Sequence, residues 1–63
     1  MKHDRIKQII RSKGYFRATP HSRERRSCDY MVRHGELREM TRKEVEARLE
    51  PWHSAAYYTL PHK

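Results

Sequence analysis

The sequence predicts a small α+β domain in which helices pack on a two-stranded antiparallel sheet. The chain has 63 residues, a length that suits one small domain. Apolar residues recur at helical spacing in the first half and alternate with polar residues in two short segments of the second half. Glycine and proline separate these segments, so we expect the order helix, helix, strand, helix, strand in a single domain, residues 1–63.

The first helix is expected at roughly residues 4–13. Its apolar residues, Ile6, Ile9 and Ile10, stand at positions i, i+3 and i+4, so they share one face. Gly14 follows the last turn and supplies a stop signal. The apolar face is narrow, as in a helix that covers one side of a small core.

A second helix is expected to end at His34, because Gly35 can adopt the left-handed conformation that terminates helices. It begins either at Thr19, where proline follows as the first helical residue, or at Ser22. Residues 15–18, which precede it, are expected to form a short extended linker that contributes aromatic packing.

The second helix is strongly two-sided. Cys28, Met31 and Val32 form its inward face. The opposite face is basic with one aromatic side chain, and comprises Arg23, Arg26, Ser27, Tyr30, Arg33 and His34.

Polar and apolar residues alternate over residues 36–40, as in a half-buried strand with Leu37 and Met40 turned inward. The following Thr41 and Glu44 have the spacing of a capping box, in which each side chain accepts a hydrogen bond from the other residue's backbone. The sequence therefore predicts a strand followed directly by a helix.

The third helix is expected to reach about Leu49, with Val45 as its other apolar residue, because Pro51 blocks continuation. The last strand is expected at residues 55–60. Tyr58 and Leu60 would lie on one face of it. The other face would carry Ala55 and Tyr57.

The composition is lean in aliphatic residues, since Leu, Ile, Val and Phe together number nine of 63. Such a composition beside a net charge of +7 is typical of disordered chains. Six aromatic residues favour a folded core, because each buries a large apolar area. We therefore expect the chain to fold.

The positive charge is concentrated in one half of the chain. Residues 1–35 contain ten Lys and Arg against three Asp and Glu, whereas residues 36–63 contain five of each. The excess charge thus lies in the half that is expected to contain two helices, and it indicates an acidic partner.

The lone Cys28 cannot form an intramolecular disulfide, which suits a reducing compartment. The N-terminus is charged and no apolar run exceeds four residues, so we expect no signal peptide and no membrane span. The expected location is cytoplasmic.

Residues 25–37, together with Tyr58-Thr59-Leu60, resemble the second half of a winged helix-turn-helix domain. In that family a recognition helix ends at a glycine, the chain enters a β-hairpin through an inward-facing leucine, and the returning strand carries an aromatic-x-leucine pair. The resemblance covers about residues 22–60. Only one clear helix precedes the candidate recognition helix, so it implies a reduced version of the fold.

This resemblance implies a small regulator or accessory factor that binds double-stranded DNA with helix 22–34 in the major groove. Arg23 and Arg26 would contact guanine O6 and N7. The residues expected to contact phosphates are Ser22, Ser27, Tyr30, Arg33 and, from the linker, Arg17. We expect a homodimer on DNA, because a monomer this small would bind a half-site weakly.

Two other partners stay open. The basic helix could inhibit or redirect a host enzyme with an acidic surface, such as RNA polymerase or a nuclease, as a phage-type modulator protein would. Trp52, expected in the core, would then be an anchor if exposed. RNA is less favoured, and would require Tyr15 and Tyr57 to stack on unpaired bases.

We expect neither catalysis, nor a cofactor, nor a bound metal. Cys28 falls on the apolar stripe, away from an activating histidine, and its spacing from His21 and His34 does not match close pairs of zinc ligands. A ribonuclease that uses His53 or His62 is the enzymatic alternative.

Overall fold

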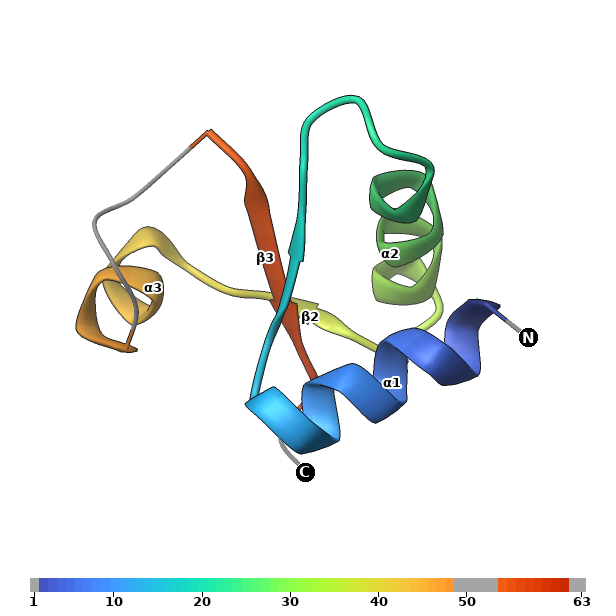
Figure 1. The fold of residues 1–63 in the computed structure, drawn as a ribbon, viewed down its shortest axis with the longest axis horizontal. Helices are drawn as coiled ribbons and strands as arrows, with labels where there is room; N and C mark the ends of the chain where they lie inside the picture. Colours follow the sequence, from blue (N-terminus) through green and yellow to red (C-terminus); the bar gives the residue numbers. More distant parts are fainter. Residues whose placement is uncertain (1, 49–53, 62–63) are drawn as a thin grey trace.

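The computed structural model describes residues 2–48 and 54–61, and within them it confirms the α+β class (Figure 1). Helices and strands alternate along the chain. They are α1 (Lys2–Lys13), β1 (Phe16–Ala18), α2 (Arg23–Arg33), β2 (Arg38–Glu39), α3 (Arg42–Arg48) and β3 (Ala56–Thr59).

The sheet has three strands, so the expectation of two strands was wrong. Its order is β1-β3-β2, with β3 antiparallel to both neighbours. The added strand, β1, is the segment expected to be a linker, and Phe16 on it pairs with Tyr58. The predicted pairing of the two later segments is confirmed, with Arg38 opposite Thr59.

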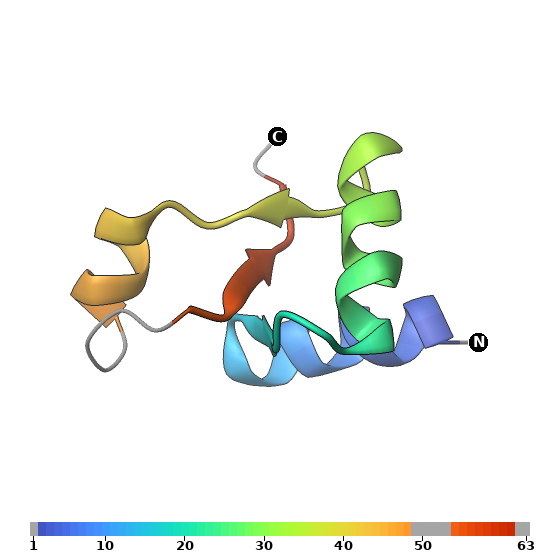
Figure 2. The same ribbon diagram turned by 90° about the horizontal axis from the view of Figure 1, so that it is seen from above.

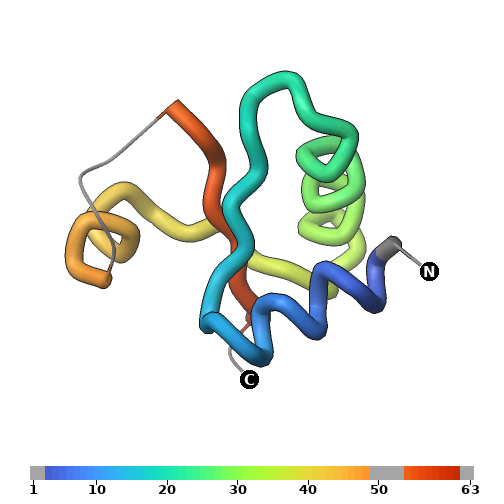
Figure 3. Tube along the Cα trace, in the orientation of Figure 1, coloured from blue at the N-terminus to red at the C-terminus, as the bar shows by residue number. Residues whose placement is uncertain are grey.

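The chain turns at Gly14, after α1, and continues into β1, as the tube in Figure 3 shows. Gly14 has φ +93°, and its N–H donates to the carbonyl of Ile10 over 2.6 Å, which closes the last turn of α1. The Thr59 hydroxyl donates to the Gly14 carbonyl over 3.2 Å and ties the turn to the end of β3. β1 thereby lies along the open edge of β3.

Helices cover both faces of the sheet: α1 and α2 lie on one side and α3 on the other (Figures 1 and 2). The alternation predicted for the last strand is confirmed, since Tyr58 and Tyr57 lie on opposite faces of β3. Tyr58 faces α1 and α2, and Tyr57 faces α3. Each face has its own apolar cluster.

The larger cluster is formed under α1 and α2 by Ile6, Ile10, Ala18, Cys28, Met31, Leu37, Ala56 and Tyr58. Phe16, Val32 and Leu60 pack against it. The smaller one, beside α3, is formed by Met40, Val45, Ala55 and Tyr57, with Tyr15 packed against it. Both strand residues predicted to point inward, Leu37 and Met40, are buried.

The capping box before α3 is confirmed. The Thr41 N–H donates to Glu44 Oε1 over 3.1 Å, and the Glu44 N–H donates to Thr41 Oγ1 over 3.3 Å. Arg38 on β2 adds a bidentate ion pair to the same carboxylate, at 2.8 and 2.7 Å. The predictions for Leu49, Pro51 and Trp52 concern residues outside the described part of the chain.

Candidate functional site

The candidate site lies on α2, whose two ends are fixed by local hydrogen bonds. Ser22 is the N-cap, so the helix begins there and the alternative start at Thr19 was wrong. Ser22 Oγ accepts from the Arg25 N–H over 3.3 Å and donates to the Thr19 carbonyl over 3.0 Å. At the other end Gly35 has φ +74°, and the next N–H, of Glu36, donates to the Met31 carbonyl over 2.8 Å.

The inward face of α2 holds the helix against the sheet. Cys28 and Met31 are fully buried in the larger cluster, and Val32 packs against it. This leaves the opposite side of the helix facing solvent. Arg23, Arg26, Tyr30 and Arg33 share that side, and we call these four residues the outward face.

Tyr30 is the one large hydrophobic side chain that is exposed in the described part of the chain, with 52% of its surface accessible. Two imidazoles flank it. The ring of His34 lies 4.1 Å from the Tyr30 ring, centroid to centroid, and that of His3, on α1, lies at 5.7 Å. The aromatic ring is therefore held between two helices next to the arginines.

The two acidic residues of α2 lie beside the outward face: Asp29 lines a hollow together with Arg23 and Arg26, and Glu24 lines another together with Arg23. Asp29 Oδ1 accepts a 2.6 Å hydrogen bond from the hydroxyl of the buried Tyr58, which draws the carboxylate toward the sheet. Burial, followed by this hydrogen bond to Asp29, raises the pKa of Tyr58, so the phenol stays protonated and remains a donor. Glu24 lines a hollow between α1 and α2.

Three of the predicted contact residues do not belong to the outward face. Ser27 is half-buried and lines the hollow between α1 and α2, because α1 packs along that flank of the helix. The Ser22 hydroxyl is engaged in capping. Arg17 is exposed on β1, where it alternates with Phe16 and Ala18 and so leaves the sheet on the side away from α2.

A second hollow, of about 450 Å³, lies at the N-terminal end of α2. Its lining includes Arg23, Arg25, Arg26 and His21, together with Asp29. Arg25 and His21 were not predicted as site residues, because a helical projection places Arg25 toward the inside and assigns no face to a residue before the helix. The signal was the run of cations at a helix start, where backbone N–H groups also attract anions.

The alternatives that required reactive or stacking groups are not supported by the geometry. Cys28 is fully buried, and burial, followed by the nearby Asp29 and Glu24 charges, raises its pKa to about 12. Tyr57 is buried beside α3 and lies 6.1 Å from Tyr15, ring to ring, so it is a core residue that presents no face for stacking on bases.

No group of three or more His, Cys, Asp or Glu that could hold a metal occurs among residues 2–48 and 54–61. The two histidines of the ribonuclease alternative, His53 and His62, lie outside these residues. Over the same ranges, every helix is too short or too polar to cross a membrane.

Comparison with known proteins adds no assignment: no family model, curated protein or solved structure matches this chain.

Proposed function

We propose that this protein binds double-stranded DNA as a reduced winged-helix domain, with α2 entering the major groove. The observation that carries the proposal is the outward face of α2, where three exposed arginines share one side of the helix with the exposed Tyr30, while one of the two acidic residues of the helix, Asp29, accepts a hydrogen bond from Tyr58 of the core. A helix face that only contacts solvent can carry acidic and basic residues alike. A face that binds DNA disfavours acidic residues, because carboxylates repel the phosphates.

The major groove is about 12 Å wide and admits an α-helix, so the residues on one exposed face can reach base edges. Arg23 and Arg26 lie in the first turns of α2, where recognition helices contact bases. Arg33, the last residue of α2, and the Tyr30 hydroxyl suit phosphate contacts on the flanking strand.

The N-terminal hollow supports the same orientation. It adds Arg25 and His21 to the cations around the start of α2, beside N–H groups that favour anions. A duplex whose groove receives this end of the helix would place backbone phosphates next to these side chains.

The packing of the residues behind the winged-helix resemblance also supports the proposal. α2 ends at Gly35, Leu37 turns into the larger cluster, and Tyr58 and Leu60 contact that cluster from the returning strand. These side chains fix the orientation of α2 on the sheet.

The test is a fluorescence-anisotropy titration of a mixed-sequence duplex at several salt concentrations. We expect log affinity to fall linearly with log salt, with a slope set by the number of phosphates neutralised. The double variant Arg23→Gln/Arg26→Gln should weaken binding by at least about tenfold, since a good bidentate contact contributes about 1–3 kcal/mol. Lys43→Gln/Arg48→Gln, an equal loss of two charges on α3 across the sheet, is the matched control and should bind as the parent does.

A second candidate, binding to an acidic surface of a host enzyme, is favoured by the exposed Tyr30, because tyrosine and arginine together are typical of protein interfaces. A folded protein that shows no duplex binding at low salt would overturn the DNA proposal in favour of this candidate. Equal losses from the Lys43→Gln/Arg48→Gln control and the α2 double variant would show that net charge, and not α2, governs binding.

A further inference from the structure

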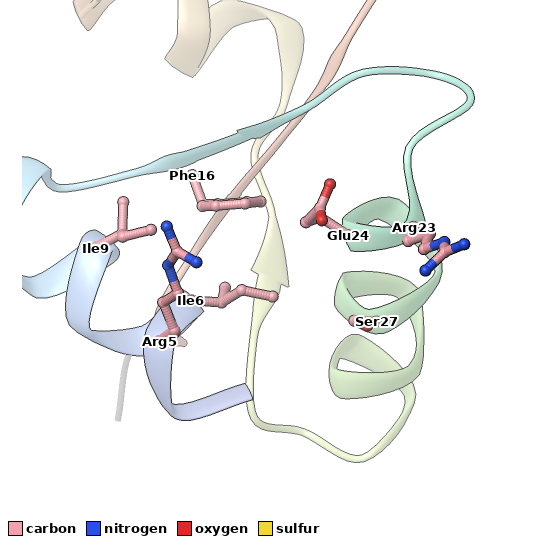
Figure 4. A pocket seen from close by; sticks show the side chains of 7 residues that line it. All are labelled: Arg5, Ile6, Ile9, Phe16, Arg23, Glu24 and Ser27. Carbon is pink, nitrogen blue, oxygen red and sulfur yellow. The ribbon is translucent and has the colours of Figure 1, made fainter. Parts of the chain in front are cut away.

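A hollow of about 310 Å³ lies between α1, β1 and α2 (Figure 4). Ile6, Ile9 and Phe16 supply its apolar floor. Its volume is at the small end of the range for ligand pockets, which are concave, mainly apolar and supplied with a few polar groups.

Leaving apolar side chains partly exposed at this floor lowers the stability of so small a protein. Only nine residues are Leu, Ile, Val or Phe, yet Ile9 and Phe16 are left half-buried at this hollow. Completing their burial would stabilise the fold in proportion to the apolar area removed from water. A ligand with an apolar body would complete it.

Two opposite charges face the hollow from different helices. In Figure 4 Arg5, on α1, and Glu24, on α2, lie on opposite sides with the Phe16 and Ile6 side chains between them, whereas Arg23 points away. The ion pairs in the described chain join other residues, namely Lys7 with Glu36, Arg38 with Glu44, and Arg42 with Glu46. Arg5 and Glu24 therefore remain available to a bound molecule.

We infer that this hollow binds a small zwitterion with an apolar body, such as an apolar dipeptide, whose carboxylate meets Arg5 and whose ammonium group meets Glu24. A guanidinium binds a carboxylate through two parallel hydrogen bonds, and a carboxylate accepts readily from an ammonium group. A ligand with one charge only would leave the other side chain facing its apolar body, which disfavours binding.

Ordinary structural roles account for each charge taken singly. Glu24 in the first turn of α2 is favourable for the helix dipole, and Arg5 is solvated. Neither role explains why the two charges lie across an apolar floor that the core leaves unfilled. Arg23 both lines the hollow and belongs to the outward face of α2, but the zwitterion would use Arg5, Glu24 and the apolar floor, so its binding does not depend on DNA binding.

The test is a ¹H–¹⁵N NMR titration of the whole protein with the dipeptide Ala-Phe and two blocked forms of it. N-acetyl-Ala-Phe lacks the ammonium group, and Ala-Phe amide lacks the carboxylate. We expect saturable shifts at the amides of Ile6, Phe16, Glu24 and Ser27. The free dipeptide should bind at least about fivefold more tightly than either blocked form, as expected for the loss of one hydrogen-bonded charge.

Variants assign each end of the ligand. In Glu24→Gln the free and N-acetylated peptides should bind equally, and in Arg5→Gln the free and amidated peptides should. Arg11→Gln removes an exposed charge from α1 outside the hollow and should retain the parent's preference. All three positions are exposed, so the variants should keep a dispersed spectrum.

Three results would overturn the inference. They are no saturable shift at the hollow with any of the peptides, equal binding of the free and a blocked form to the parent protein, and a preference that survives both Arg5→Gln and Glu24→Gln.

Discussion

At the level of single residues, Tyr58 links the core to the candidate DNA-binding helix. Its ring is fully buried in the larger cluster, and its hydroxyl donates to Asp29 on α2 over 2.6 Å. This hydrogen bond both satisfies a buried donor and draws an acidic group toward the sheet. One side chain thereby serves stability and the charge distribution of α2.

Tyr58→Phe should lower the free energy of unfolding by about 1 kcal/mol, since it removes one hydrogen bond and keeps the ring. It should also weaken duplex binding, because the Asp29 carboxylate is no longer held toward the sheet. Urea denaturation and the anisotropy titration measure the two effects. Asp29→Asn in the Tyr58→Phe background is the control, and it should restore binding. Parent-like binding by Tyr58→Phe would refute this role for the hydroxyl.

The ionisation of Glu44 makes the stability of the fold depend on pH. The bidentate hydrogen bonds from Arg38, and then those from Thr41, hold the pKa of this carboxyl well below its usual range. A carboxyl with a lowered folded-state pKa stabilises the fold above its unfolded pKa of about 4.3, and this contribution is lost as the pH falls further. The lowered pKa of Glu36, caused mainly by its hydrogen bond from Lys7, acts in the same direction.

We therefore expect Glu44→Gln to have a lower Tm than the parent at pH 7, and the difference to shrink as the pH falls below about 4. Thermal denaturation followed by circular dichroism from pH 7 to pH 2 measures it. Glu46→Gln, which removes the exposed pair with Arg42, is the matched control on the same helix and should change the profile less. A difference in Tm between Glu44→Gln and the parent that stays constant with pH would contradict the assignment.

At the level of helices and strands, the end of α2 depends on one backbone conformation. Gly35 has φ +74°, and a Cβ added there would meet nothing within 4 Å. The cost of a side chain is therefore backbone strain alone. Gly35→Ala should lower the free energy of unfolding by about 1–2 kcal/mol.

Gly35→Asn is the control for that prediction, because asparagine tolerates the left-handed region better than alanine does. Chemical denaturation of both variants at one pH distinguishes the two costs. Equal stability of Gly35→Ala and the parent would show that the helix end does not need this conformation.

Local signals explain which elements were predictable. The ends of α1 and α2, the capping box at Thr41 and the two faces of β3 follow from residues close together in sequence. β1 was missed because it has three residues and is defined by pairing with β3 at the other end of the chain. No periodicity within residues 15–18 reports that pairing.

The residues of the candidate site were also predictable only where local sequence determines their position. The outward arginines and Tyr30 were predictable, because helical periodicity alone places them together. Ser27 and Arg17 were grouped with them wrongly. Ser27 lies beside α1, and Arg17 points to the side of the sheet away from α2, and both placements depend on tertiary packing. The hollow lined by Ile9 and Phe16 forms where α1, β1 and α2 meet, so no local sequence pattern predicts it.

At the level of the whole molecule, the sheet separates two apolar clusters of unequal size. Among residues 2–48 and 54–61, eight buried residues form the cluster under α1 and α2, and four form the one beside α3. Within these residues, α3 is held by the buried Val45 and by the ion pair between Arg38 and Glu44. Parts of a protein with fewer buried contacts open at lower free energy than the remainder.

We therefore expect the backbone amides of α3 to exchange with solvent through a local opening, at lower free energy than those of α2. Native-state hydrogen exchange followed by NMR measures both.

Val45→Ala should lower the protection of α3 by about 1–3 kcal/mol while changing α2 less, because the cavity lies on the α3 side of the sheet. Met31→Ala, in the larger cluster, should lower the protection of α2 while changing that of α3 less. If α2 and α3 exchange at the same free energy and fall together in Val45→Ala, the domain opens as one unit. If α3 opens alone, the face of α2 proposed to bind DNA stays formed while the opposite side of the sheet is open, and Val45→Ala should bind the duplex as the parent does.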